Sequence, residues 1–171
     1  MNSIEKLLNQ HQEDWSLNQK FYKDEAIFDL ERRQIFFDSW IFIGHDSQIP
    51  NKGDYFIYKI LDEEIIVLRN KENQVKAFFN VCRHRGSRVC LEKRGNATRF
   101  SCPYHSWTYN LDGKLLAAKS LREGIDKSSL GLHPCNIESV SGMLLLNLSD
   151  NPQSLENLKN DLSEPFEMFG F

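Results

Sequence analysis

The chain has 171 residues, of which 40% are hydrophobic and 26% are charged, a composition typical of a soluble globular protein. The net charge of −3 gives no overall field that favours nucleic acid or an anionic membrane, so we expect neither as a partner. The N-terminus lacks the basic and apolar segments of a secretion signal, and the longest aliphatic run, residues 143–146, is far shorter than the ~20 residues of a membrane span. We therefore expect a cytoplasmic protein.

The first forty residues predict a helical lead-in. After a short first helix, Asp24 is placed to cap a second one that carries Phe28, Ile35, Phe36 and Trp40 at roughly helical intervals. We expect these apolar side chains to pack in the core rather than to line a ligand site.

Beyond Trp40 the chain predicts antiparallel β structure. Short segments rich in β-branched and aromatic residues are separated by turn residues such as Asp112-Gly113. The expected strands lie within residues 40–45, 53–60, 63–70, 74–81, 99–102, 106–110, 114–119 and 142–149. Residues 119–133 lack periodicity and predict a long loop, and one helix is expected after Pro152.

This pattern predicts an α+β fold that is mainly β. We expect a helical lead-in over residues 1–40, an antiparallel β domain over 41–150, and a helix and tail over 151–171. The last six residues hold three phenylalanines and a methionine, which are normally buried. This tail is therefore expected either to lead into a further domain of a longer chain or to fold back on its own domain.

Two short segments combine the side chains that bind metals. Cys82-x-His84 is followed, after 17 residues, by Cys102-x2-His105, so each segment offers one sulfur and one nitrogen. Cysteines are too sparse for a disulfide scaffold. We expect the two remaining ones, at positions 90 and 135, to be ordinary buried residues.

The spacing leaves two kinds of metal site open. A zinc ion bound by two cysteines and two histidines needs all four ligand atoms within about 2.0–2.3 Å of one ion. In a nearly extended Cys-x-His segment the two side chains start roughly 6–7 Å apart on one face of the strand. A two-metal cluster accommodates that separation more easily, because sulfur and nitrogen then bind different ions.

The segments CRHRGS and CPYHSWTYNLDG resemble the two ligand loops of the Rieske [2Fe–2S] domain. The resemblance implies one [2Fe–2S] cluster between two hairpin loops of an antiparallel β domain, with Cys82 and Cys102 on the inner iron and His84 and His105 on the outer iron. Residues at further family positions around the cluster are Gly86, Pro103, Trp107 and Tyr109. Ser106 stands where these loops usually carry glycine or another residue before the tryptophan, and we infer no change of function from it.

The same resemblance bears on the reduction potential. High-potential Rieske proteins join their loops through an additional disulfide, and here Ser87 and Tyr104 occupy those positions. They also place a serine donor two residues after the second histidine, where this chain has Trp107. The resemblance therefore implies a potential at the low end of the Rieske range of about −150 to +300 mV.

Residues 20–153 are most similar to the α subunits of Rieske non-haem iron oxygenases. This implies one-electron transfer within an enzyme that hydroxylates or demethylates a small molecule, using O₂ and electrons from NAD(P)H. A reductase or ferredoxin is the implied electron donor, and a neighbouring subunit of a trimer is the implied acceptor. The mononuclear non-haem Fe(II) site is expected in the missing domain, so we expect no catalytic residue here. Aromatic rings and quaternary amines are both possible substrates, and the second loop resembles the amine-type members at least as well.

Two alternatives remain at this stage, an autonomous Rieske-type ferredoxin and a zinc-bound structural module. Residues 82–105 also carry six basic residues against one acidic residue. We interpret Arg83 and Arg85, which flank His84, as a docking surface for a partner. The alternative interpretation is ordinary solvated surface.

Overall fold

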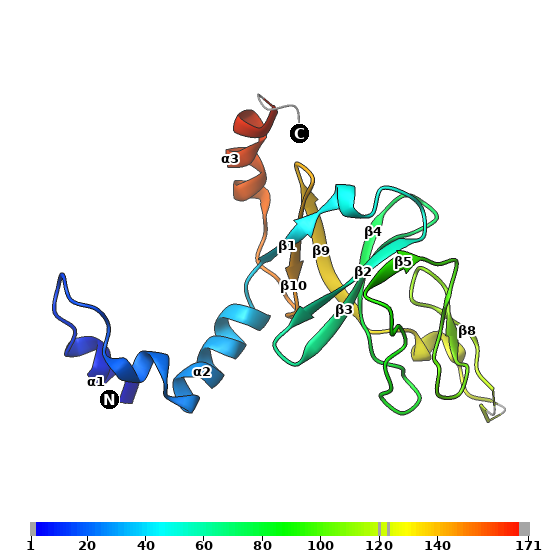
Figure 1. The fold of residues 1–171 in the computed structure, drawn as a ribbon, viewed down its shortest axis with the longest axis horizontal. Helices are drawn as coiled ribbons and strands as arrows, with labels where there is room; N and C mark the ends of the chain where they lie inside the picture. Colours follow the sequence, from blue (N-terminus) through cyan, green and yellow to red (C-terminus); the bar gives the residue numbers. More distant parts are fainter. Residues whose placement is uncertain (1–2, 120, 123, 168–171) are drawn as a thin grey trace.

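The computed structural model describes residues 3–119, 121–122 and 124–167. It consists of a β domain with a helical arm on its N-terminal side and a helix at its C-terminal end (Figure 1). This confirms the predicted α+β class with mainly β structure.

Two antiparallel sheets form the β domain. In spatial order the larger sheet contains β1 (Ile41–His45), β10 (Met143–Asn147), β9 (Pro134–Val140), β4 (Val75–Phe79), β3 (Glu63–Arg69), β2 (Asp54–Ile60) and β5 (Arg94–Asn96). The smaller sheet contains β6 (Phe100–Ser101), β7 (Thr108–Tyr109) and β8 (Leu115–Ala117).

Strand β3, in the interior of the larger sheet, is buried on both faces. Its side chains alternate, so Ile66 and Leu68 pack with residues of the smaller sheet, whereas Ile65 and Val67 pack with β1 and β10 on the opposite face. Each of these four residues is fully buried. The larger sheet therefore separates two hydrophobic cores, and one of them supports the smaller sheet.

The eight strands predicted from the sequence are all present, but two others were missed. Strand β5 contains three exposed residues, so it has no hydrophobic pattern and is defined only by its pairing with β2. Strand β9 begins with a proline and pairs with β10 and β4. The predicted loop 119–133 contains a short 3-10 helix, η4 (Lys127–Leu130).

The lead-in is helical as predicted, but it does not pack against the β domain as predicted. Its elements are α1 (Ser3–Asn9), η1 (Gln19–Tyr22), α2 (Glu25–Glu31) and a π-helical turn, η2 (Arg32–Phe37). Asp24 caps α2 by accepting hydrogen bonds from the backbone N–H groups of Ala26 and Ile27.

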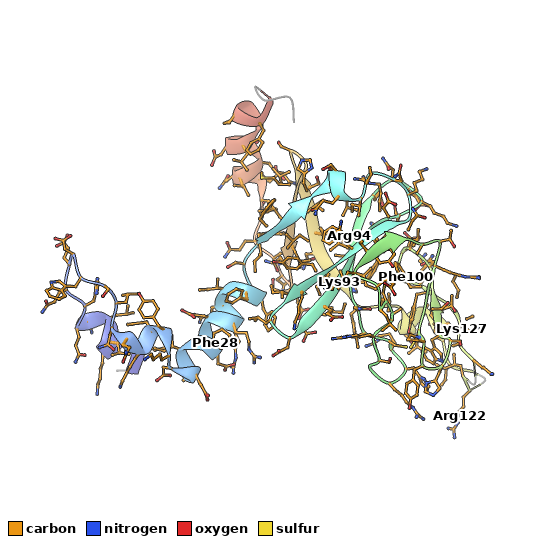
Figure 2. All side chains as sticks on the ribbon, in the orientation of Figure 1. Phe28, Lys93, Arg94, Phe100, Arg122 and Lys127 are labelled. Atoms are coloured by element: carbon orange, nitrogen blue, oxygen red, sulfur yellow. The ribbon has the colours of Figure 1, made fainter. Side chains whose placement is uncertain are left out.

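The prediction that Phe28 and Ile35 lie in the core is wrong, because these side chains are 50% and 51% exposed. The arm extends away from the sheets, as Figures 1 and 2 show for α2 and the labelled Phe28. Of the four side chains, all within the described residues, Phe36 and Trp40 near the end of the arm pack against the β domain. Helical spacing shows that side chains share one face, but it does not show what that face contacts.

The predicted C-terminal helix is α3 (Glu156–Glu167). The last four residues of the predicted tail, 168–171, lie outside the described residues. Within the described part of the chain, no helix is long and apolar enough to cross a membrane.

Candidate metal centre

The Cys-His segments lie in two loops next to the smaller sheet. The second loop is the tip of the β6–β7 hairpin, as expected. The first loop connects β4 to β5, and these strands pair with other partners rather than with each other. The expectation that both loops are hairpin tips is therefore wrong for the first one.

The first loop is a tight turn and not an extended segment. The backbone N–H of Cys82 donates to the carbonyl of Ser87 at 2.8 Å, and the N–H of Gly86 donates to the carbonyl of Cys82 at 3.0 Å. Our expectation of an extended Cys82–His84 segment is thus wrong. His84 lies inside the turn, so its distance from Cys82 is not set by the rise of a strand.

The second loop repeats the same turn. The N–H of Cys102 donates to the carbonyl of Trp107 at 2.8 Å, and the N–H of Ser106 donates to the carbonyl of Cys102 at 2.9 Å. Ser106 has φ = 60°, and its counterpart Gly86 has φ = 71°. Both positions need the left-handed conformation that glycine adopts most easily, which gives a physical reason for a glycine at this position.

The two cysteines of the loops meet as a buried thiol pair. Cys82 and Cys102 are each 2% exposed and form no disulfide. Burial raises the pKa of the Cys82 thiol, and the adjacent Cys102 thiol raises it further. The Tyr109 hydroxyl and the backbone N–H of His84 oppose this shift by donating to the sulfur. These two donors favour the thiolate form, which is the form that binds metals.

The two histidines meet as a half-buried imidazole pair. Nδ1 of His84 lies 3.1 Å from Nδ1 of His105, and the ring centroids are 4.6 Å apart. Desolvation lowers the pKa of His105, and the neighbouring charges of His84 and Arg85 lower it further. The neutral form that binds metals is therefore favoured at this ring.

The distance between the imidazole nitrogens fits two ligands of one ion. Metal–nitrogen bonds of about 2.0–2.1 Å in tetrahedral geometry place two ligand nitrogens roughly 3.3–3.4 Å apart. Among the residues that the structure describes, no three histidine, cysteine or acidic side chains are grouped to hold a single ion. A sulfur pair beside a nitrogen pair is the donor set of a two-metal cluster with two protein ligands on each ion.

Comparison with known proteins identifies this arrangement. Residues 39–134 match the Rieske [2Fe-2S] domain, a segment that includes both Cys-His loops and most of the β domain. The chain belongs to the Rieske [2Fe-2S] domain family. Its cofactor is accordingly a [2Fe–2S] cluster.

Curated relatives of this Rieske domain are oxygenase subunits. The chain is 42% identical over 166 residues to the glycine betaine monooxygenase oxygenase subunit of Chromohalobacter salexigens, covering 95% of this chain and 37% of the relative. It is 35% identical over 146 residues to the carnitine monooxygenase oxygenase subunit of Acinetobacter baumannii, covering 84% and 39%. The chain thus spans less than half the length of these relatives.

Solved structures agree in fold. The quaternary ammonium Rieske monooxygenase CntA superposes with a TM-score of 0.83 at 32% identity, over 90% of this chain and 44% of that chain. Naphthalene 1,2-dioxygenase from Rhodococcus sp. superposes with a TM-score of 0.82 at 34% identity, over 93% and 38%.

Tyr109 connects the Rieske loops to the smaller sheet. Its hydroxyl oxygen lies 3.3 Å from the sulfur of Cys82 and accepts a hydrogen bond from the backbone N–H of Arg83 at 3.1 Å. Because the hydroxyl oxygen accepts from this N–H, the hydrogen of the hydroxyl can donate to the sulfur of Cys82. Burial is the main reason why the pKa of Tyr109 is raised, so the hydroxyl keeps this hydrogen at neutral pH.

The other residues at family positions surround the histidines. The Trp107 ring is buried and stacks on His84, with centroids 4.8 Å apart and ring planes 12° apart. Pro103 is exposed in the turn of the second loop. The exposed Tyr104 ring lies 3.8 Å from His105, measured between centroids.

Asn80 holds the first loop closed, a role that we did not predict from the sequence. This residue is 1% exposed, and its side-chain oxygen accepts from the N–H groups of Val89 (3.0 Å) and Cys90 (2.8 Å). Its amide nitrogen donates to the carbonyl of Cys90 and to the carboxylate of Glu64. The sequence signal was an asparagine that interrupts the apolar run AFFNVC.

The basic residues of segment 82–105 do not form one patch. Arg88 pairs with Glu64 at 2.8 Å. Arg94 begins β5, an edge strand of the larger sheet, and Lys93 directly precedes it (Figure 2). The charge of Arg85 acts on His105, whereas Arg83, the sequence neighbour of His84, contacts the ring of His133, which is not one of the two paired imidazoles.

The remaining cysteines differ in environment. Cys90 is buried as expected, whereas Cys135 is only half-buried. Burial and the charge of Glu63 raise the pKa of Cys135 to about 12, so its thiol stays protonated and weakly nucleophilic.

Proposed function

We propose that this chain is the electron-receiving Rieske domain of a non-haem iron oxygenase. Cys82 and Cys102 bind the inner iron, and His84 and His105 bind the outer iron. The observation that supports this assignment most directly is the pair of facing Nδ1 atoms 3.1 Å apart, next to a separate buried thiol pair.

The thiol pair and the imidazole pair differ in their exposure, which supports different roles for them in electron transfer. The thiols are buried beneath the loops, where Tyr109 donates to Cys82. The imidazoles are half-buried and line a cavity of about 280 Å³ with Tyr104, Ser106 and Lys119. When bound, the cluster supplies uptake and release of one electron at a time. The histidine side of the site is where a partner protein can approach.

The proposal extends to the organisation of the whole enzyme. The Rieske domain occupies about residues 41–150, preceded by the lead-in 1–40 and followed by 151–171, which leads to a domain with a mononuclear non-haem Fe(II). A reductase or ferredoxin donates electrons, and a neighbouring subunit of a trimer receives them, in the cytoplasm. In support, the structure of a quaternary ammonium Rieske monooxygenase that is 32% identical to this chain is described as giving insights into inter-subunit electron transfer.

We further propose a quaternary amine as the substrate. The glycine betaine and carnitine monooxygenase subunits are 42% and 35% identical to this chain, whereas the biphenyl dioxygenase α subunit of Paraburkholderia xenovorans is 31% identical. The test is O₂ consumption by the full-length enzyme that contains this chain, since the substrate is bound in the domain with the mononuclear iron. Consumption should depend on glycine betaine or carnitine and should not depend on biphenyl.

The ligand set is tested by metal and sulfide analysis of the purified chain. We expect two irons and two acid-labile sulfides per chain, as the family name implies, together with an electron paramagnetic resonance signal on reduction. Cys102→Ser and His105→Ala should lose this signal, whereas Cys90→Ser should keep it because Cys90 lies outside the thiol pair. One zinc per chain without sulfide contradicts the proposal.

The potential is a separate prediction. Because Ser87 and Tyr104 stand where the disulfide would be, and the serine hydroxyl of the high-potential proteins is replaced by the indole of Trp107, we expect a midpoint near the low end of the range, about −150 mV. A spectroelectrochemical titration measures it. A midpoint well above zero contradicts this reasoning.

The proposed docking role of Arg83 and Arg85 is tested by charge reversal. Arg83→Glu with Arg85→Glu should slow reduction of the chain by a ferredoxin and weaken the salt dependence of the rate. Lys93→Glu with Arg94→Glu is the matched control, since it reverses the same number of charges at and next to β5. If the double variant and the control have the same rates as wild type, the arginines are ordinary surface residues.

A further inference from the structure

Trp107 is held in place from two directions. Its carbonyl accepts the N–H of Cys102, which closes the second loop, and its ring stacks on His84 of the first loop. The side chain is 4% exposed and belongs to the same buried cluster as Cys82, Cys102 and Tyr109. The indole therefore lies against both cysteine-histidine loops at once.

The indole N–H of Trp107 lacks an acceptor within the protein. The nitrogen is buried, and among the residues that the structure describes no acceptor lies within hydrogen-bonding distance. Trp40 gives the contrast, because its N–H donates to the carbonyl of Gln153 at 2.7 Å. Nearly all buried donors in native proteins have an acceptor, so this unpartnered N–H points to an acceptor in a group that the site binds.

We propose that Trp107 donates its indole N–H to a sulfur atom of the [2Fe–2S] cluster and thereby raises the reduction potential. The inference rests on the proposed function, because the acceptor belongs to the bound cluster. Reduction adds one electron, supplied by a protein of the reductase or ferredoxin class, and forms or breaks no covalent bond. Hydrogen bonds to more negative acceptors are stronger, so this donor stabilises the reduced state more than the oxidised state.

The test variant is Trp107→Phe. Phenylalanine keeps a six-membered aromatic ring beside His84 and lacks the five-membered ring that carries the indole N–H. We expect the equilibrium constant for reduction to fall roughly tenfold, a midpoint about 59 mV lower for a one-electron couple. The measurement is a spectroelectrochemical titration of the cluster-loaded chain. Trp40→Phe is the matched control and should leave the midpoint unchanged, because the N–H of Trp40 already has a carbonyl acceptor remote from the loops.

A second measurement on the wild-type chain covers the case in which Trp107→Phe fails to load a cluster. With indole-¹⁵N-labelled tryptophan, pulsed electron paramagnetic resonance of the reduced chain should detect one coupled indole nitrogen, which Trp40→Phe retains. A midpoint equal to wild type in cluster-loaded Trp107→Phe overturns the inference, as does the lack of a coupled indole nitrogen in the wild type. A wild-type chain that binds no iron or sulfide overturns the proposed function instead.

Discussion

Asn80 offers the sharpest test of how the first Rieske loop is held. Replacing it by alanine removes the side-chain oxygen that accepts from the N–H groups of Val89 and Cys90, both of which are buried. It also removes the donor to the carbonyl of Cys90 and to Glu64. The loop that carries Cys82 and His84 then loses its internal cross-link, two residues before the first ligand.

The expected cost follows from the two stranded donors. Each buried N–H left without an acceptor costs about 1–3 kcal/mol, so two of them give about 3–4 kcal/mol once some water enters the space that the side chain leaves. The bond to Glu64 adds little, because this carboxylate keeps its ion pair with Arg88. We therefore expect Asn80→Ala to lower the free energy of unfolding by about 3–4 kcal/mol.

The assay is guanidinium denaturation of the cluster-loaded chain, followed by far-ultraviolet circular dichroism and by visible absorbance of the cluster. Asn136→Ala is the matched control, since Asn136 donates to the carbonyls of Asn147 and Ser149 and leaves no buried N–H behind. It should cost about 1 kcal/mol. A loss below about 1 kcal/mol for Asn80→Ala shows that the loop is held by the cluster alone and refutes the reasoning.

Three further predictions concern the same loops. Ser106→Gly should raise the free energy of unfolding by about 0.5–1 kcal/mol, because it relieves a serine in the left-handed conformation. Gly86→Ala should lower the free energy of unfolding by about 1 kcal/mol, since the added Cβ meets no described atom within 4 Å and only the backbone is strained. If denaturation curves show that both variants shift the free energy of unfolding in the same direction, the argument from a shared turn is wrong. Tyr109→Phe removes the hydroxyl donor to Cys82 and should lower the midpoint in a redox titration, whereas an unchanged midpoint means that the hydroxyl serves only the backbone. In the cluster-free chain the pKa of His105 is lowered from 6.5 by folding, so the unfolded chain binds more protons at this residue than the folded chain as the pH falls below that value. The free energy of unfolding should therefore decrease from pH about 7.5 to about 5.5, and it should decrease less in His105→Gln. Urea midpoints at each pH measure this change.

Features that depend on local chemistry could be predicted from the sequence. The strands β2, β3 and β4 have clear β-branched and aromatic content, and the four Cys-His residues are spaced as in the Rieske family. The capping of α2 by Asp24 follows from the same kind of local rule. Strand composition, ligand spacing and helix capping each depend on residues that are close in the sequence. Contacts with distant segments therefore do not alter these predictions.

Features that depend on distant partners could not be predicted. Strand β5 consists of Arg94, Gly95 and Asn96, and it exists because β2 offers an edge to pair with. Phe28 is apolar and correctly spaced, yet the arm carries it away from the sheets. Asn80 is polar and buried because its partners are backbone groups ten residues along the loop. In each case the missing information is a contact between segments.

The metal centre itself combines both kinds of information. The two loops have the same turn, closed by the same pair of backbone hydrogen bonds, but His84 is the second residue after its cysteine and His105 is the third. Equal turns with unequal spacing bring the two imidazoles together from different positions of the turn, and Trp107 of the second loop then covers His84 of the first. Neither histidine is therefore fixed by its own loop alone. The sequence identifies the four side chains, whereas their pairing, sulfur with sulfur and nitrogen with nitrogen, arises only when the loops face each other.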